Sequence, residues 1–431
     1  MITLTRFICI VCLASGSISN ASAQALDPIL GAEKLWTLKQ DQFQAATGNL
    51  PFRWTSNAKD SARAAAPGMT LFGLRVYEVV ARFEGETLKE ITAAFYARGD
   101  AGELDKEHYE SLVGLSAAAL NNFTATKYTV RGKDPSNAVK AEGLQWQTDK
   151  GRYLLEYSFT KEVKTRSIPF RAEFVRLEIT PPEHKASLLT SATNITRAKF
   201  TGLMHVKRDN AGGDTWLFDV PMIDQGQKGY CVVAATERVM RYYGIAVDAN
   251  ELAQIANSDS QAGTSSEGMF SALKKIATRL HVRVRMVEEQ SVKAIQDMVK
   301  DYNRAAKHAH ATEIPPLSHL IDVGAIYKNL DYAVLKEART KNSSDLSRFQ
   351  RAVQTNIDQG TPLLWCVQLG LSPEPGIPQN AGGHMRLIIG YNSSSHEILF
   401  SDSWGAGHEL KRMPAADAWT ITTGLTTVEP L

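Results

Sequence analysis

One cysteine in the sequence has a setting that favours chemistry. Cys231 follows a polar, glycine-containing loop over residues 224–230 (DQGQKGY) and begins a segment, residues 231–243, whose pattern predicts a helix. The first backbone amides of a helix lack partners within the helix, and together with the helix dipole they stabilise a thiolate. A buried structural cysteine would also suit this position, so the choice depends on the other residues that could act with Cys231.

A thiolate that attacks an amide carbonyl needs a base or ion-pair partner, a residue that orients this base, and a hydrogen-bond donor for the oxyanion. Gln225 lies six residues before Cys231, so its side-chain amide can donate to an oxyanion together with the Cys231 backbone amide. His384 and Asp402 are the candidates for the base and its orienting residue. These four residues indicate acyl transfer through a thioester.

His384 and Asp402 are predicted to meet across a β-hairpin. One predicted strand begins at His384, the next ends just before Asp402, and a polar turn lies between them. A hairpin centred on Ser393 places the imidazole and the carboxylate directly opposite each other, with their backbones about 5 Å apart. His396 is a poorer base because six extended residues would hold it roughly 20 Å from Asp402. His408 follows two glycines in a predicted loop.

The order of these residues resembles the papain-like cysteine peptidases. In that superfamily a Gln before the nucleophilic Cys completes the oxyanion hole, a later His pairs with the thiolate, and an Asn in an Asn-Ser-Trp-Gly stretch orients the His. The matching motifs are Asp224-Gln225-Gly226, Gly229-Tyr230-Cys231, His384 and Asp402-Ser403-Trp404-Gly405. The resemblance implies these catalytic roles for Gln225, Cys231, His384 and Asp402. It also implies a binding cleft lined by Gly229, Tyr230, Gly383 and Trp404, with Trp404 shielding the contact between His384 and Asp402 from water.

Departures from the papain pattern point to one branch of the superfamily. Asp402 stands where papain-type enzymes have Asn, Val232 stands where they have Trp, and their disulfide cysteines are missing. The sequence is more similar to the bacterial bacteriocin-processing peptidases, which act at double-glycine leaders, and to their stand-alone relatives. Because papain-type relatives use Asn, the resemblance implies that Asp402→Asn retains partial activity. It also implies a papain-like α+β fold, in which a helical half beginning at the Cys helix packs on an antiparallel sheet.

The chain is long enough for more than one domain. Its 431 residues are 43% hydrophobic, so two or three domains can each bury a core. Strand and helix patterns predict a separate α+β domain before the peptidase-like region, and within it residues 86–98 are expected to form a helix. The predicted organisation is a signal peptide over 1–23, the α+β domain over 24–185, a linker over 186–214, the papain-like domain over 215–412 with a helical insertion at 290–350, and a C-terminal segment over 413–431.

Charge and the N-terminal residues predict an exported protein. Lys and Arg total 48 and Asp and Glu total 46, so nothing favours nucleic acid or an anionic membrane as the main partner. Residues 1–23 have the layout of a secretory signal peptide, with an apolar run too short to span a membrane. Its removal would leave Cys231 and Cys366, which an oxidising compartment could link as a disulfide.

The sequence therefore predicts an exported, soluble cysteine peptidase that acts on a peptide or protein substrate without a cofactor or metal. Four side chains of the insertion, His308, His310, His319 and Glu313, do not favour a metal site. Two histidines at i and i+2 diverge on a helix, and Pro315 and Pro316 interrupt the segment. Two other functions stay open. One is a catalytically silent papain-like protein that binds a peptide or a cell-envelope component, and the other is a transferase that passes the thioester to an amine.

Overall fold

The computed structural model describes most of the chain from residue 24 to residue 431. The residues outside the description are 1–23, 33, 49, 132–137, 164, 166, 184–195, 198–199, 201–204, 227–228, 246, 259–265, 290, 316–322, 373, 375 and 378–380. The expected signal peptide thus lies outside the described residues. Within the part that is described, no helix has the length and apolar character needed to cross a membrane.

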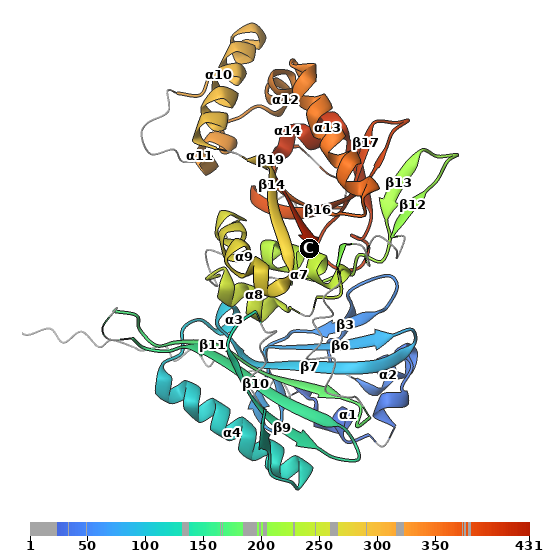
Figure 1. Cartoon of the computed structure of the whole chain (residues 1–431), viewed down its shortest axis with the longest axis vertical. Coiled ribbons are helices and arrows are strands. Elements are labelled where there is room, and N and C mark those ends of the chain that lie inside the picture. Colours follow the sequence, from blue (N-terminus) through green and yellow to red (C-terminus); the bar gives the residue numbers. More distant parts are fainter. Residues whose placement is uncertain are drawn as a thin grey trace, which may run out of the picture.

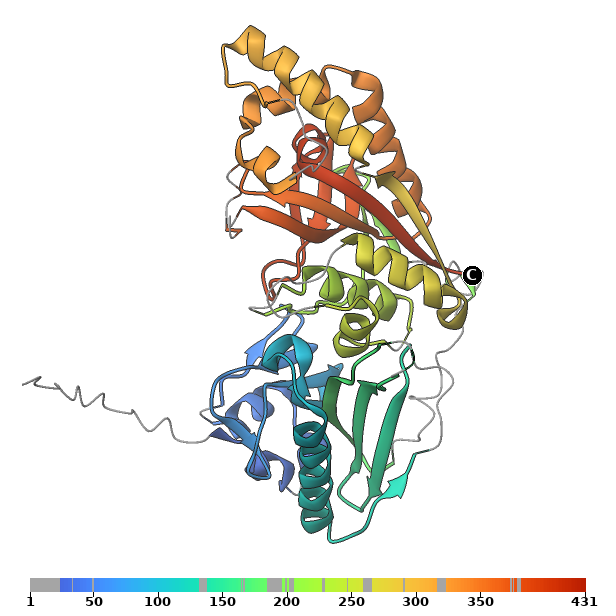
Figure 2. The ribbon, with the colours of Figure 1, turned by 90° about the vertical axis from the view of Figure 1, so that its left-hand side faces the viewer.

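Two units follow one another along the long axis of the molecule, each built on an antiparallel sheet (Figure 1). Three helices lie between the two sheets in both views (Figure 2). These helices are α7 (Cys231–Tyr242), α8 (Ala249–Ile255) and α9 (Ser266–Leu280). The first residue of α7 is Cys231, as the sequence predicts, so the candidate nucleophile lies in the middle layer of the molecule.

The N-terminal unit contains an eight-stranded sheet in the order β2-β3-β6-β7-β11-β10-β9-β8. Its strands are β2 (Arg53–Trp54), β3 (Ser61–Ala64), β6 (Glu78–Glu84), β7 (Thr87–Ala97), β8 (Thr129–Val130), β9 (Ala141–Gln147), β10 (Arg152–Thr160) and β11 (Arg171–Thr180). The long helix α4 (Lys106–Thr124) packs against β9, β10 and β11. A small sheet and short helices complete the unit: β1 (Gln24–Ala25), β4 (Met69–Leu71), β5 (Leu74–Arg75), α1 (Asp27–Leu30), α2 (Gln40–Ala46) and α3 (Arg98–Ala101).

The predicted helix over residues 86–98 is wrong, because this segment forms strand β7. Leu88, Ile91 and Phe95 have the spacing of a helix face, yet all three are buried side chains of one strand. The last five residues of β7, 93–97, are all buried. A strand covered on both faces loses the two-residue alternation by which strands are recognised in sequence, so a chance helical spacing dominated the pattern.

The C-terminal unit contains the second eight-stranded sheet, which has helices packed against it. Six strands follow the order β12-β13-β16-β15-β19-β14, and β17 and β18 extend the sheet from β16. Their bounds are β12 (Val206–Arg208), β13 (Asp214–Leu217), β14 (Val282–Glu289), β15 (Leu363–Leu369), β16 (Gly382–Asn392), β17 (Glu397–Ser401), β18 (Lys411–Pro414) and β19 (Thr422–Pro430). Helices α7 and α13 (Ser343–Asp358) both pack against β16. The predicted α+β class is confirmed.

Several predicted boundaries in this unit need correction. Residues 413–431 are not a separate segment, because they include α14 (Ala415–Ile421) and strand β19, which pairs with both β15 and β14. Strand β12 lies within the expected linker and pairs with β13. The insertion has a small core of its own, formed by α10 (Val292–Ala309), α11 (Val323–Lys328) and α12 (Tyr332–Thr340), but α13 belongs to the main core.

Candidate active site

The nucleophile candidate is positioned by a deeply buried helix. Ten of the twelve residues of α7 are buried, whereas the thiol-bearing residue Cys231 at its start is partly exposed. The N-cap residue Tyr230 makes no side-chain cap, so its own side chain does not occupy the first amides of the helix. Cys231 and Cys366 are both free thiols in the structure. Burial raises the pKa of the Cys366 thiol to about 11, which disfavours its thiolate.

His384 and Asp402 are in contact, although the predicted register of their hairpin is wrong. Asn392 lies opposite Glu397, and a bulge farther along leaves Leu387 opposite Ser401. Continuing this register places Asp402 opposite residue 386, so His384 is its diagonal neighbour. The side chains bridge the diagonal, with 2.6 Å between His384 Nε2 and Asp402 Oδ1. The turn covers residues 393–396 and is centred later in the chain than Ser393, which explains the shift.

The buried carboxylate of Asp402 has three hydrogen-bond donors around it. Its Oδ1 accepts from His384 Nε2 and from the Ser403 backbone amide at 2.8 Å, and its Oδ2 accepts from Arg386 Nε at 2.7 Å. Burial alone would raise the pKa of Asp402, but the hydrogen bond and charge of His384 and the charge of Arg386 lower it below its usual value. Asp402 is therefore ionised at neutral pH.

His384 is placed between Asp402 and Cys231. Because Nε2 faces Asp402, the hydrogen bond between His384 and Cys231 uses the opposite ring nitrogen, Nδ1. The indole of Trp404 stacks on the imidazole with ring centroids 4.6 Å apart and an interplanar angle of 13°. The His384 side chain is only 5% exposed, so the contact with Asp402 is sheltered from water. The structure thus brings His384, Asp402 and Trp404 together at one place.

Gln225 lies next to the loop that follows β17 and carries Asp402 and Ser403. Its backbone amide donates to the Ser403 carbonyl at 2.8 Å, and the Ser403 hydroxyl donates to Gln225 Oε1 at 2.6 Å. The second contact orients the amide, because its oxygen is held by Ser403. Two glycines predicted at the cleft are exposed: Gly229, two residues before Cys231, and Gly383, where an added Cβ would meet nothing within 4 Å.

Two buried arginines that the sequence analysis did not identify tie the site together. Arg238 on α7 donates to the Pro221 carbonyl at 2.7 Å, to the Asp402 carbonyl at 2.9 Å and to the Ser401 hydroxyl. Arg386 on β16 contacts the Asp402 carboxylate. The sequence signal for each arginine was its charge within an otherwise apolar helix or strand, because a buried charge requires a partner. The partner itself is distant in sequence and could not be named.

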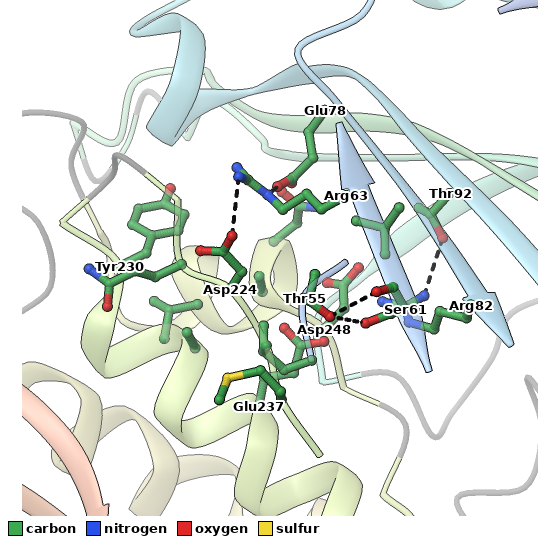
Figure 3. Close-up of a pocket in the computed structure, with 18 residues that line it drawn as sticks. Thr55, Ser61, Arg63, Glu78, Arg82, Thr92, Asp224, Tyr230, Glu237 and Asp248 are labelled. Carbon is green, nitrogen blue, oxygen red and sulfur yellow. Dashed lines mark hydrogen bonds and ion pairs between the residues drawn. The ribbon is translucent and has the colours of Figure 1, made fainter. Parts of the chain in front are cut away.

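The N-terminal unit contacts the loop that carries Gln225. Residues of both units line a cavity of about 80 Å³. Among the side chains that line it, Arg63 extends from β3 toward Asp224 (Figure 3). Arg63 pairs with Glu78 of its own unit and lies 4.0 Å from the Asp224 carboxylate. The ring of Tyr230, the residue before Cys231, packs directly on Gly99 of α3. Both ends of the loop are thus held by the N-terminal unit.

The fold and this arrangement define a papain-like cysteine peptidase class: a helix that begins at a cysteine packs against an antiparallel sheet that carries the histidine. The model of the Peptidase_C39 like family matches residues 217–426. This part of the chain is thus similar to that family of papain-like cysteine peptidases, and the resemblance inferred from the motifs is confirmed. The match extends beyond residue 412, in agreement with the corrected boundary. No curated protein matches the sequence.

Proposed function

We propose that this protein is an exported cysteine peptidase that hydrolyses peptide bonds with Cys231, His384 and Asp402 as a triad. The observation that carries the proposal is the pair of hydrogen bonds of His384, one to Asp402 and one to Cys231 at the start of α7. Gln225 is proposed to complete the oxyanion hole, because Ser403 holds its amide oxygen beside the same loop. The substrate is proposed to be a peptide or protein.

The proposed reaction has two halves. The Cys231 thiolate attacks the peptide carbonyl carbon, and the oxyanion accepts hydrogen bonds from the Gln225 side chain and the Cys231 amide. The imidazolium of His384 then gives its Nδ1 proton to the departing amine as the carbon–nitrogen bond breaks, which leaves a thioester. His384 next removes a proton from water, the hydroxide attacks the thioester carbonyl, and the thiolate leaves with the acid product released.

The pH dependence follows from the setting of His384. Burial alone lowers the pKa of this imidazole, but its hydrogen bonds to Asp402 and Cys231 raise the pKa to about 9. The imidazolium is therefore retained at neutral pH and is lost as the pH rises through about 9. We expect kcat/KM for peptide hydrolysis to decline above pH 9, measured as a pH profile. A decline that begins near pH 6.5, the ordinary value for histidine, would contradict this assignment.

Labelling with a thiol-directed peptide electrophile, such as a peptidyl vinyl sulfone, tests the proposed function. We expect one covalent adduct on Cys231, located by mass spectrometry of the proteolytic fragments, and none on Cys366, whose thiolate is disfavoured. Product analysis with an added amine then separates hydrolysis from transfer to the amine. Absence of any adduct on Cys231 under conditions where a small alkylating reagent does react would count against peptidase activity.

The proposal of export is based on the signal-peptide pattern of residues 1–23. The mature protein is proposed to begin near Gln24, and its intact mass together with its N-terminal sequence checks this position. Retention of residues 1–23 in the exported protein would contradict cleavage.

A further inference from the structure

The carboxylate of Asp402 meets donors on both of its oxygens. Oδ1 faces His384 Nε2 and the Ser403 amide, and Oδ2 faces Arg386 Nε. The Ser403 amide and the guanidinium can only donate. Both terminal atoms of the side chain at position 402 must therefore accept hydrogen bonds, a requirement that a carboxylate meets and an amide does not.

Arg386 is held rigidly on the side away from Asp402. Its side chain has no exposed surface, and its two terminal nitrogens donate to the Glu374 carboxylate at 3.0 and 3.2 Å. Aromatic rings enclose the guanidinium, with the Phe400 ring centroid at 4.8 Å and the Trp404 centroid at 6.0 Å. A guanidinium stays protonated in proteins, so Arg386 cannot turn from donor to acceptor.

We propose that Arg386, anchored by Glu374, is a positioning residue that requires a carboxylate at position 402 and thereby fixes the proton of neutral His384 on Nε2. This inference rests on the proposed function, because only the tautomer with Nε2 protonated leaves Nδ1 able to take the thiol proton of Cys231. It also gives a physical reason why Asp stands here in place of the Asn of papain-type enzymes: those enzymes need one acceptor at this position, and Arg386 adds the need for a second.

The consequence for Asp402→Asn is opposite to the one implied by the family resemblance. If the Asn amide nitrogen takes the Oδ2 position, it faces Arg386 Nε, and two donors are buried against each other. If the nitrogen takes the Oδ1 position, it faces the Ser403 amide and His384 Nε2. The histidine must then accept at Nε2 and carry its proton on Nδ1, so it no longer accepts the proton of Cys231.

A set of variants tests the inference. We expect Asp402→Asn to lower kcat/KM for peptide hydrolysis by on the order of 10³-fold or more, whereas Arg386→Met lowers it by less than about tenfold because Asp402 still accepts from His384. In Asp402→Asn/Arg386→Met, the Asn oxygen is free to face His384, so kcat/KM should recover at least about tenfold over Asp402→Asn. The matched control is Asp402→Asn/Arg412→Met, which removes an arginine that instead pairs with Asp214 and Glu397 and should give no recovery.

Two further measurements keep the test decisive. The rate at which iodoacetamide alkylates Cys231 should follow the same order among the variants, and it requires no peptide turnover. The ¹⁵N shifts of His384 in Asp402→Asn report which ring nitrogen carries the proton. If Arg386→Met does not fold, Arg386→Gln serves in its place. The glutamine oxygen can accept from the amide nitrogen introduced by Asp402→Asn, and the glutamine nitrogen can donate to the Glu374 carboxylate. Thermal unfolding of each variant controls for loss of fold.

The outcomes separate the two claims. Near wild-type kcat/KM in Asp402→Asn, or a double variant no better than Asp402→Asn alone, overturns the role of Arg386. A different outcome would overturn the proposed function. In it, the alkylation rates of Cys231 follow the expected order among the variants, but the wild-type protein neither hydrolyses peptides nor reacts with a peptide electrophile. The positioning role of Arg386 would then still be supported.

Discussion

Cys231→Ala is expected to reduce kcat/KM for peptide hydrolysis by on the order of 10⁴-fold or more, because it removes the only atom that forms the proposed thioester. The substitution deletes one partly exposed sulfur at the start of α7 and leaves the backbone of the helix unchanged. Alanine is also the best helix former, so the free energy of unfolding should change little. The measurement is steady-state hydrolysis of a fluorogenic peptide, with thermal unfolding to verify the fold.

The matched control is the same substitution at the other described cysteine. Cys366 on β15 lies opposite Met385 rather than His384, and burial raises its thiol pKa to about 11. Cys366→Ala should therefore keep kcat/KM within about threefold and at most lower the melting temperature, as the loss of a partly buried sulfur does. Equal losses in both variants would point to a structural cause, and full activity in Cys231→Ala would end the proposed mechanism.

Gly99→Ala is expected to impair catalysis from the N-terminal unit. A Cβ at Gly99 would overlap the phenol of Tyr230, whose residue is only 5% exposed and directly precedes Cys231. The ring must move, and because the residue is buried we expect the start of α7 to shift with it. Overpacking of this kind costs about 1–3 kcal/mol of stability, and a displacement of about 1 Å at a nucleophile lowers kcat by about 10²-fold. Steady-state kinetics and thermal unfolding measure both effects.

The control for Gly99→Ala is the same change in helix α4 of that unit. Gly114 is exposed, and an added Cβ there meets nothing within 4 Å. Gly114→Ala should leave kcat unchanged and stabilise the helix by about 0.5–1 kcal/mol, because alanine loses less backbone entropy than glycine. If Gly99→Ala matches Gly114→Ala in kcat, the contact of Tyr230 with the N-terminal unit does not position Cys231.

Residue types and local patterns were sufficient to propose the chemistry and to predict the class of fold. The glycine-containing loop before an apolar helical segment identified the helix that starts at Cys231. Two alternating segments around a polar turn identified the strands that bring His384 to Asp402. These signals are short in range, because a helix start and a hairpin each depend on residues within about twenty positions. The family motif added the order of the four proposed catalytic residues, which no single pattern supplies.

Tertiary structure decided what depends on partners far apart in the chain. The bulge in the hairpin moved Asp402 opposite Arg386, and the Glu374 carboxylate on the other side of that arginine lies in a separate loop. Residues 413–431 enter the middle of the sheet because strand pairing does not follow sequence order. The approach of Gly99 to Tyr230 joins two domains. The sequence alone determined which groups are proposed to react. Their protonation states and exact placement were decided by burial and by contacts that only the folded chain forms, because a buried charge or a close packing contact is defined by all its neighbours at once.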